Sequence, residues 1–463
     1  MSAWIVVVGA GPAGLMAASE AVERGARVTL VDEFPRPGGQ IYRQSASAKR
    51  EVPIGLESER NRKRAILSAF ERIAGRVEYL KGAVAYSLFP GPELHVAHEG
   101  ATRELRPDAV VLATGVCERA VPFPGWTLPG VLFAGGVQAT LKSQGIRAGE
   151  RAVVVGAGVL PIAVAAQLVE SGADVQSLVL TTPLRAMLRR PLGLWAGRTV
   201  VAEGRRYLRT LRSAGVERLE GWVPVRAEGS ERVERLTVAR HRNGHAVSGT
   251  ERTLECDLVA MNFGFVANSE LARMAGAEVT FDAHRGGWIP RADAFGRTSV
   301  TGVLVAGDGA GLRGAWVAAA EGRIAGAAAV VESRAEPLDS IAVDLAAAFA
   351  ERSRHVRFQA AVGETLRLPD GVWTWADAGT VCCRCECVTR ARLDRAVSEG
   401  HTTVNAVKRN TRAGMGWCGG RVCMHTIAAL VAGGRLAGDT EGPTPRPVAR
   451  LVTLAEIANR AQP

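Results

Sequence analysis

The sequence contains no run of about 18 consecutive apolar residues, the length that crosses a bilayer as a helix. Aromatic residues make up only 5% of it, so it lacks the stacking platforms of proteins that bind single-stranded nucleic acids. The net charge of +11 comes mostly from arginine, but the arginines are dispersed among acidic residues rather than gathered in a basic tract. We therefore expect no transmembrane segment and no nucleic-acid partner.

Cysteine pairs suited to dithiol chemistry are also missing from most of the chain. Upstream of residue 382 the cysteines are Cys117 and Cys256, which stand alone. The other six of the eight lie between residues 382 and 423, a clustering that disfavours a disulfide framework and favours metal binding in a reducing compartment. No Ser–His–Asp set or carboxylate pair stands out either. We therefore expect a cytoplasmic location, no dithiol reductase activity and no catalytic base that can be named on this chain.

What the sequence does contain is a dinucleotide-binding turn at its start. Residues Trp4–Val8 form a short β-branched run typical of a buried parallel strand, and the residues after the turn have the pattern of a helix. Between them Gly9 makes the tight turn, Gly11 lets the backbone approach a pyrophosphate, and Gly14 lets helix and strand pack closely. The next strand ends at Asp32, where a carboxylate can accept hydrogen bonds from a ribose.

Two later segments indicate which dinucleotide binds there. Residues 110–115 (Val-Val-Leu-Ala-Thr-Gly) and 302–309 (Gly-Val-Leu-Val-Ala-Gly-Asp-Gly) each have the pattern of a strand that ends in a turn of small residues. They resemble the Ala-Thr-Gly and Gly-Asp signatures of the two-dinucleotide-binding flavoproteins, the disulfide-reductase-like superfamily. The resemblance implies FAD at the first turn, with Asp308 on its ribityl chain. The residues expected to bind FAD are Gly9, Gly11, Pro12, Ala13, Gly14, Asp32, Glu33, Gly39, Gln40, Thr114, Gly115, Gly307 and Asp308.

A second Rossmann-like unit follows, with a strand at 152–155, a turn at 156–161 and a helix at 162–170. Its fingerprint is incomplete, because Pro161 replaces the third glycine and the next strand, 175–180, ends in threonines rather than an acid. Proline is acceptable at the start of a helix, so we expect the fold to survive and the ribose-binding carboxylate to be lost. The ligand of this unit stays open between NAD(P), another nucleotide such as ATP, and none.

Four cysteines near the C-terminus have the arrangement C-x-C…C-x4-C, namely Cys383, Cys385, Cys418 and Cys423. Thiolates are soft ligands, and two close pairs fit either one tetrahedral zinc or a [2Fe–2S] cluster. The additional Cys382 and Cys387 make the choice of ligands ambiguous by one residue in either direction. Helical patterns at 389–399 and 424–431 predict a small helical module around the metal.

The same region carries a second resemblance. Residues 381–389 and 407–423 resemble the bacterioferritin-associated-ferredoxin-like [2Fe–2S] domain, which implies an iron–sulfur cluster on the four cysteines. Together with residues 35–43, 123–131 and 307–316, they resemble the large flavin subunit of bacterial opine and amino-acid dehydrogenases. This group includes the A subunits of octopine and nopaline oxidases, the B subunit of hydrogen cyanide synthase and the α subunits of hydroxyproline dehydrogenases. The likeness runs over nearly the whole chain.

This resemblance implies a hetero-oligomeric enzyme. In the group, a smaller FAD-containing subunit oxidises the C–N bond of an opine, a proline derivative, glycine or sarcosine, and electrons pass by the [2Fe–2S] centre to an acceptor. A second flavin, FMN, can sit between subunits, and a small ferredoxin-like subunit is a further partner. The chain is thus expected to be the FAD- and [2Fe–2S]-containing α subunit that relays electrons. Two alternatives stay open: a self-contained NAD(P)H-dependent flavin and iron–sulfur reductase, and a non-enzymatic scaffold.

We predict an α/β fold of two dinucleotide-binding, disulfide-reductase-like domains and a small C-terminal helical [2Fe–2S] domain. Further helices are expected at 198–214 and 342–352. The predicted units are a discontinuous FAD-binding domain at 1–115 and 290–330, a second nucleotide-binding-like domain at 116–289, a connector at 331–379, the [2Fe–2S] domain at 380–432 and an extended tail at 433–463.

Overall fold

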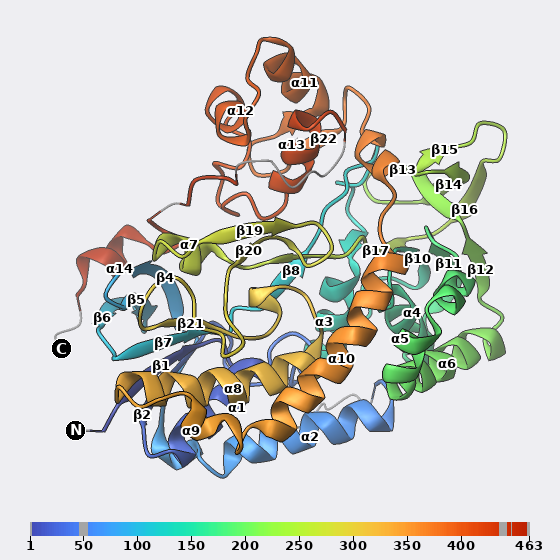
Figure 1. Cartoon of the computed structure of the whole chain (residues 1–463). Helices are drawn as coiled ribbons and strands as arrows, with labels where there is room; N and C mark the ends of the chain where they lie inside the picture. Colours follow the sequence, from blue (N-terminus) through green and yellow to red (C-terminus); the bar gives the residue numbers. More distant parts are fainter. Residues whose placement is uncertain (1, 46–53, 435–441, 446, 461–463) are drawn as a thin grey trace.

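Figure 1 shows the computed structural model of the chain, which describes residues 2–45, 54–434, 442–445 and 447–460. Two five-stranded parallel sheets lie side by side with helices around them, and helices near the C-terminus form a separate group beyond the sheets. The predicted fold class is confirmed. Parts of the predicted tail, residues 435–441, 446 and 461–463, lie outside the described residues.

The first sheet has the strand order β21-β7-β1-β2-β3, and every neighbouring pair is parallel. Its strands are mostly valine, leucine and isoleucine because both faces are covered. Helices α1 and α8 cover one face and approach closely, since a Cβ on Gly322 would lie only 2.1 Å from the carbonyl oxygen of Ala13. The bounds are β1 (Trp4–Val8), α1 (Pro12–Glu23), β2 (Arg27–Asp32), β3 (Val77–Lys81), β7 (Ala109–Leu112), β21 (Val303–Val305) and α8 (Ala315–Ser333).

An antiparallel sheet of order β4-β5-β6, which no motif predicted, covers the other face. Leu88, Leu94 and Val96 of this sheet are fully buried in one core with the first parallel sheet. Leu271 of α7, from the segment between the two parallel sheets, packs in the same core. The domain limits proposed near residues 115 and 290 stay a prediction. The bounds are β4 (Val84–Phe89), β5 (Glu93–His98), β6 (Ala101–Leu105) and α7 (Glu270–Met274).

The second parallel sheet has the order β12-β11-β10-β17-β9. Helices α3, α4 and α6 pack on one face, where Tyr207 and Leu211 are buried, and a sheet formed by β13, β14 and β16 packs on the other. The strands and helices predicted in this unit are present. The bounds are β9 (Val131–Phe133), α3 (Ala134–Gln144), β10 (Arg151–Gly156), α4 (Leu160–Glu170), β11 (Asp174–Leu180), α6 (Arg198–Ser213), β12 (Glu217–Glu220), β13 (Trp222–Glu228), β14 (Arg235–Arg242), β16 (Arg252–Glu255) and β17 (Leu258–Asn262).

The two halves are joined by strands and by a helix pair. Strand β8 (Val116–Glu118) pairs antiparallel with β18 (Phe265–Ala267) between the sheets. Helix α2 (Glu57–Glu71) meets α6 through the Arg62 guanidinium, which forms a bidentate ion pair with Glu203 at 2.5 and 3.1 Å. The Ser58 hydroxyl donates a third hydrogen bond to the same carboxylate at 2.7 Å. This contact fixes the second sheet against the first.

The connector contains the longest helix, which differs from the prediction. A short helix, α9 (Asp339–Ala342), precedes α10 (Ala346–Thr365), so the helix expected at 342–352 begins four residues later and continues much further. The extension follows from packing, since Phe358 and Val362 are buried against the segment 184–201. A Cβ on Gly197 would lie 2.1 Å from the Phe358 ring. The covering segment includes α5 (Pro191–Ala196).

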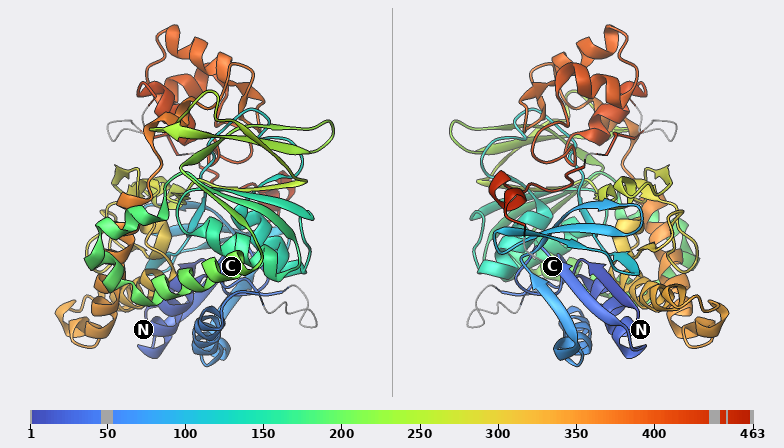
Figure 2. Two further views of the ribbon diagram at one scale, coloured as in Figure 1. Left: turned by 90° about the vertical axis from the view of Figure 1, so that its right-hand side faces the viewer. Right: turned by 90° about the vertical axis from the view of Figure 1, so that its left-hand side faces the viewer.

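The C-terminal group of helices, here called the cysteine module, consists of residues 380–432. Figure 2 shows it at one end of the molecule in both turned views. Its helices share a core that contains Leu393, Val407 and Ile427. Of these helices, the one at 404–411 was not predicted. The bounds are β22 (Val381–Cys383), β23 (Val388–Thr389), α11 (Arg390–Ser398), α12 (Val404–Thr411) and α13 (Met424–Val431).

The described part of the tail folds back onto the rest of the protein. The Arg273 side chain donates a hydrogen bond to the carbonyl of Pro443, and the backbone N–H of Ala449 donates to the backbone carbonyl of Tyr86 at 2.7 Å. Residues 454–458 form the short helix α14 (Leu454–Ala458), which lies beside β6. The tail therefore contacts both the α7 segment and the antiparallel sheet. None of the helices in the described ranges is long and apolar enough to span a membrane.

We expect Arg62→Met to lower the free energy of unfolding by about 3 kcal/mol, because it leaves the Glu203 carboxylate largely buried without its partner. The double variant Arg62→Met/Glu203→Leu should recover much of that loss. Arg252→Met provides the matched control, since its bidentate pair with Glu217 is about half exposed and is expected to contribute less than about 1 kcal/mol. Urea denaturation would measure all three, and equal losses for Arg62 and Arg252 would contradict the expectation.

Candidate functional site

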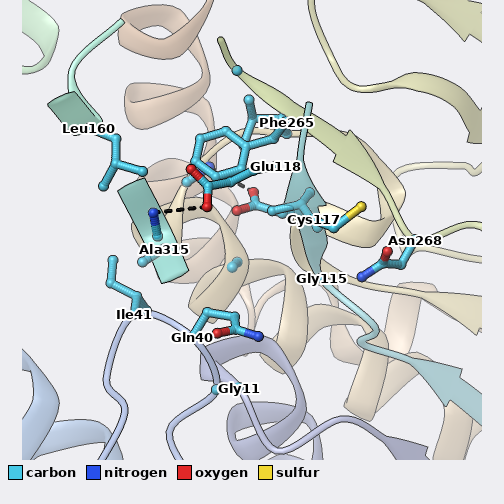
Figure 3. A pocket seen from close by; sticks show the side chains of 18 of the residues that line it. Gly11, Gln40, Ile41, Gly115, Cys117, Glu118, Leu160, Phe265, Asn268 and Ala315 are labelled. Carbon is cyan, nitrogen blue, oxygen red and sulfur yellow. Dashed lines mark hydrogen bonds between the residues drawn. The ribbon is translucent and has the colours of Figure 1, made fainter. Parts of the chain in front are cut away.

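A cavity of about 1030 Å³ opens at the carboxyl ends of the two parallel sheets, where open α/β sheets bind their ligands. Figure 3 looks into it and shows Gln40, Cys117, Glu118, Phe265 and Asn268 around the space. Of the thirteen residues predicted to bind FAD, all but Gly14 and Gly307 line it. The lining set is Gly9, Gly11, Pro12, Ala13, Asp32, Glu33, Gly39, Gln40, Thr114, Gly115 and Asp308.

The three glycines of the first turn have different surroundings. A Cβ on Gly9 would lie 2.4 Å from the Ala113 carbonyl oxygen, and one on Gly14 would lie 1.6 Å from the Gly9 carbonyl oxygen. Backbone packing therefore requires these two glycines. A Cβ on Gly11 would meet its nearest atom, the Gly39 Cα, only at 3.8 Å, because this glycine faces the cavity. Gly11 thus leaves room for a ligand beside the first turn of α1, whose free N–H groups suit a phosphate.

Asp32 lies at the end of β2, beside this turn. Its carboxylate accepts hydrogen bonds from the backbone N–H groups of Ala10 and Phe34, the latter at 2.7 Å. Burial raises the pKa of Asp32, and the two backbone hydrogen bonds oppose that rise. The carboxylate is fixed at the cavity wall, where it can accept a hydrogen bond from a ribose hydroxyl. The neighbouring Glu33 lies 3.5 Å from Arg450 of the tail.

Asp308 lies in the turn after β21 and also lines the cavity. Its Oδ1 accepts hydrogen bonds from the backbone N–H groups of Arg313 and Gly314, both at 2.8 Å, which leaves Oδ2 for a hydroxyl of a polyol chain. Burial raises the pKa of Asp308, against the effect of these hydrogen bonds. Gly307 brings this turn close to α1, since a Cβ there would lie 2.8 Å from the Ala13 Cβ.

Asn268 adds a polar group that the sequence did not indicate. Its amide nitrogen donates to the carbonyl of Thr114 at 3.0 Å, and the Thr114 hydroxyl donates to the Asn268 carbonyl at 2.6 Å. The side-chain oxygen of Asn268 is buried and accepts no hydrogen bond from the described residues, although it lines the cavity. A heteroaromatic ring with an N–H donor would satisfy it. The glycine cradle, the two carboxylates and Asn268 together fit a flavin dinucleotide.

The structure brings the four predicted cluster cysteines together in two pairs. Cys383 is hydrogen-bonded to Cys423, and this contact lowers the pKa of Cys383 to about 6. Cys385 is hydrogen-bonded to Cys418, and burial raises the pKa of Cys385 to about 11. The loop that carries Cys418 packs closely against Cys385, since a Cβ on Gly416 would lie 2.3 Å from the Cys385 Cβ. This contact supports the pairing of Cys385 with Cys418.

The separation of the pairs distinguishes between the two metals considered. Four thiolates around one zinc at about 2.3 Å would place all four sulfurs close together. Among the described residues, the group of three or more candidate ligands with donor atoms within 4.8 Å of one another is Glu93, His95 and Glu104, and it includes no cysteine. No three of the four sulfurs are therefore within 4.8 Å of one another, and two thiol pairs correspond to the two ligands on each iron of a [2Fe–2S] cluster.

Cys382 and Cys387 lie outside these pairs. The Cys382 side chain is fully buried with its sulfur 3.7 Å from the Thr380 carbonyl oxygen, and burial raises its pKa to about 12. Cys387 is exposed, with its sulfur 3.8 Å from the Arg384 carbonyl oxygen. The role of the four paired cysteines as ligands stays a prediction, and the geometry favours that set over its neighbours.

Arg421 links the cysteine module to the cavity. Its guanidinium donates to the carbonyl of Cys418 at 2.8 Å and to the carbonyl of Ala449 at 2.5 Å, and its Nε lies 3.0 Å from a Glu270 carboxylate oxygen. The side chain is only 15% exposed. Cys418 and Arg421 both line the cavity that holds the predicted flavin residues. No sequence motif pointed to Arg421 or Glu270, because their pairing joins distant segments of the chain.

Glu118 is the other unpredicted group in the cavity. It accepts hydrogen bonds from the Asn262 amide at 2.7 Å and from the backbone N–H of Gly135 at 2.8 Å, and burial raises its pKa. Its carboxyl group therefore occupies the N-terminal end of α3 and faces the cavity. Cys117, on the same strand, is close to Glu270, and its pKa is raised to about 12, chiefly by burial.

The second nucleotide-binding-like unit offers fewer partners for a ligand. Gly158 lines the cavity, but β11 ends at Leu180 and is followed by Thr181 and Thr182 instead of an acid. The Thr182 hydroxyl lies 3.5 Å from the carbonyl oxygen of Arg367, so the segment that follows α10 covers this end of the strand. Strand β11 therefore has no carboxylate for a ribose at its end, although Asp370, from the segment that follows α10, lines the same cavity.

Comparisons with known proteins agree with this architecture. Residues 4–322 match the pyridine nucleotide-disulphide oxidoreductase family, and residues 381–432 match the BFD-like [2Fe-2S] binding domain. The A subunit of opine oxidase from Agrobacterium tumefaciens (strain Ach5) is 32% identical over 98% of this chain and 91% of its own length. The HcnB subunit of hydrogen cyanide synthase from Pseudomonas aeruginosa is 32% identical over 90% of each chain. The crystal structure of L-proline dehydrogenase from P. horikoshii has the same fold, with a TM-score of 0.69, 17% identity, and coverage of 99% of this chain and 80% of that one.

The glycine geometry predicts opposite outcomes for two small substitutions. Gly11→Ala should fold normally but lower flavin affinity by about tenfold or more, because its methyl group stands in the cavity where the ligand approaches. Gly14→Ala should instead destabilise the fold, since its Cβ would overlap the Gly9 carbonyl. Circular dichroism would report folding and visible absorbance would report bound flavin. A Gly14→Ala protein with normal flavin content would contradict this account.

The thiol pairing predicts which cysteines the metal needs. Each of the four substitutions Cys383→Ser, Cys385→Ser, Cys418→Ser and Cys423→Ser should abolish the iron–sulfur absorption, with iron and acid-labile sulfide lost together. Cys382→Ser and Cys387→Ser are the matched controls and should keep both, because their side chains lie outside the pairs. Zinc in the purified protein, without sulfide, would rule out the cluster.

Proposed function

The chain belongs to the pyridine nucleotide-disulphide oxidoreductase family, in the group that includes the A subunit of opine oxidase, and we propose that it relays electrons in an amino-acid or opine dehydrogenase. The family is one of flavin-dependent oxidoreductases, and the match to a BFD-like [2Fe-2S] domain makes this chain an iron–sulfur flavoprotein. In the proposal it is the α subunit, with FAD at the first dinucleotide site and the cluster on the four paired cysteines. The substrate class is a C–N bond in an opine, a proline derivative, glycine or sarcosine.

One observation carries this proposal: the predicted flavin residues and Cys418 line one cavity. FAD accepts electrons in pairs, and a [2Fe–2S] cluster carries them singly. Arg421 holds the Cys418 loop against Glu270 at this point, so the chain itself keeps the two sites together. A cavity shared by both sites is what an electron relay requires.

The lack of two features of independent reductases also supports the role of an electron-relaying subunit. The two cysteines that line the cavity with the predicted flavin residues, Cys117 and Cys418, belong to distant segments and are both free thiols, and Cys418 is a predicted cluster ligand. A dithiol relay beside the flavin is therefore not indicated. The second nucleotide unit has no acid after β11, which argues against NAD(P)H as the electron source. The Arg62–Glu203 contact also holds that unit against α2. Whether NAD(P), ATP or no nucleotide binds there stays part of the proposal to be tested.

The partner proposal rests on the names of the relatives. The opine oxidase and hydrogen cyanide synthase relatives are by name subunits of larger enzymes, so this chain too is expected to work with other chains. We propose a smaller FAD-containing subunit that oxidises the substrate, with FMN at the interface between them and a small ferredoxin-like subunit as further components. Electrons leave to a separate acceptor.

We expect the purified chain alone to oxidise opines, proline or sarcosine at least about 100-fold more slowly than the complex obtained by co-expression with its neighbouring genes. The physical reason is that, in the proposal, the C–N bond is oxidised at the flavin of the partner subunit and not at the FAD of this chain. Anaerobic addition of NADH or NADPH should leave the flavin absorbance unchanged, while dithionite bleaches it. Full activity of the lone chain would overturn the subunit proposal, and rapid bleaching by NAD(P)H would favour the alternative of a self-contained reductase.

A further inference from the structure

A large aromatic side chain stands exposed beside the cluster cysteines. Trp417 immediately precedes Cys418 and is 71% exposed, one of the most exposed large apolar side chains among the described residues. The backbone around it is tied to the site, because Gly416 packs against Cys385 and the Cys418 carbonyl accepts from Arg421. Trp417 is therefore held at the surface by the loop that carries a predicted ligand.

The cysteine pairs lie between this surface and the interior cavity. Cys383 and Cys423 are buried, whereas Cys385 and Cys418 are half-buried. Cys418 lines the cavity on one side, and Trp417, next to it, faces solvent on the other. A cluster bound by all four cysteines would therefore be nearest to solvent at Cys385 and Cys418.

The sequence of the module around this place has a net positive charge, and three of its guanidinium groups, those of Arg390, Arg412 and Arg421, are ion-paired. Residues 380–432 contain eight lysines and arginines against three acids. Arg384 and Arg412 are both exposed. Arg384 directly precedes Cys385, and the Arg412 Nε lies 2.8 Å from a carboxylate oxygen of Glu386, which directly follows Cys385. Arg384 also stacks over the buried Trp126 ring at 5.3 Å, which fixes its position. The cysteine module therefore presents an exposed tryptophan with fixed guanidinium groups nearby.

We propose that this face of the module, formed by Arg384, Arg412 and Trp417, is where a separate acidic redox protein docks and takes one electron from the cluster. Electron-transfer contacts are small and transient, and complementary charge brings the partners together, so an acidic partner suits a basic face. An exposed tryptophan gives such a contact its apolar centre. The inference rests on the proposed relay function and adds the exit point and the charge of the acceptor. One electron leaves the reduced cluster for the oxidised acceptor, and no bond forms or breaks.

The test uses two small haem proteins of opposite charge as acceptors, the acidic soluble domain of cytochrome b5 and the basic cytochrome c. The holo-chain is reduced with dithionite and freed of excess reductant, and haem reduction is followed by stopped flow. At low salt, cytochrome b5 should be reduced about tenfold faster than cytochrome c after correction for driving force, and the difference should disappear at high salt. Surface plasmon resonance with oxidised cytochrome b5 measures the same contact without electron transfer.

Two variants and a matched control locate the contact. Trp417→Ala and Arg384→Gln/Arg412→Gln should each slow reduction of cytochrome b5 and weaken its binding by about tenfold at low salt. The double arginine variant should also flatten the salt dependence. Trp195→Ala and Arg198→Gln provide the control, since Trp195 is 72% exposed and has Arg198 over its ring, far along the chain from the module.

Three outcomes would overturn the inference. Equal rates with both haem proteins would mean that charge does not select the acceptor. An effect of Trp195→Ala equal to that of Trp417→Ala would mean that any exposed tryptophan suffices. If Trp417→Ala released the co-expressed flavin subunit and left haem reduction unchanged, the face would belong to subunit assembly. Dithionite reduces the cluster directly, so the docking test does not depend on electron transfer from the flavin. Failure of the reduced flavin to reduce the cluster would therefore count against the relay function but not against the docking face.

Discussion

The arrangement of the two redox sites depends on the Arg421 guanidinium. It is held by a carbonyl of the ligand loop, a carboxylate of α7 and a carbonyl of the tail, and it is mostly buried. The module is also joined to the rest of the chain by the Trp126 indole, which donates to the Val381 carbonyl at 2.7 Å, and by hydrogen bonds between Asn405 and the tail at Gly442 and Thr444. Arg421 differs from these contacts because it lines the cavity, where two carbonyl groups and a carboxylate surround its guanidinium. That geometry puts Cys418 on the wall of the flavin cavity.

The two parallel sheets contribute differently to the cavity beside this contact. The first sheet keeps the glycine turn, Asp32 and Asp308 that suit FAD, whereas the second sheet keeps the strand order but has no ribose carboxylate. Its strand ends meet α10 and the segment that follows it, while Gly158 and Val159 of its glycine turn line the cavity. The carboxyl group of Glu118 occupies the N-terminal end of α3. The second unit thus forms one wall of the cavity and supports the module.

Much of this was predictable from the sequence because the signals are local. Gly9, Gly11 and Asp32 lie within one strand–turn–helix–strand unit, and the cysteine spacings lie within one module, so periodicity and spacing describe them. The groups that join distant segments were not predictable. Arg421 and Glu270, or Arg62 and Glu203, are ordinary charged residues until the fold brings them together. The antiparallel sheet β4–β6 was missed although β5 alternates polar and apolar residues, because no motif marks it. Helix α10 was placed too early because the packing of its Phe358 against residues 184–201, not a cap, sets its extent.

The C-terminal segment has a consequence for how the protein is made. The carbonyl groups of Pro443 and Ala449 complete the contacts of Arg273 and Arg421, and the Ala449 N–H ties the same stretch to Tyr86. These residues follow the clustered cysteines along the chain. The segment that holds the cysteine loop against the flavin domain is therefore translated after the loop itself, and the contact between the two can form only once that segment has emerged.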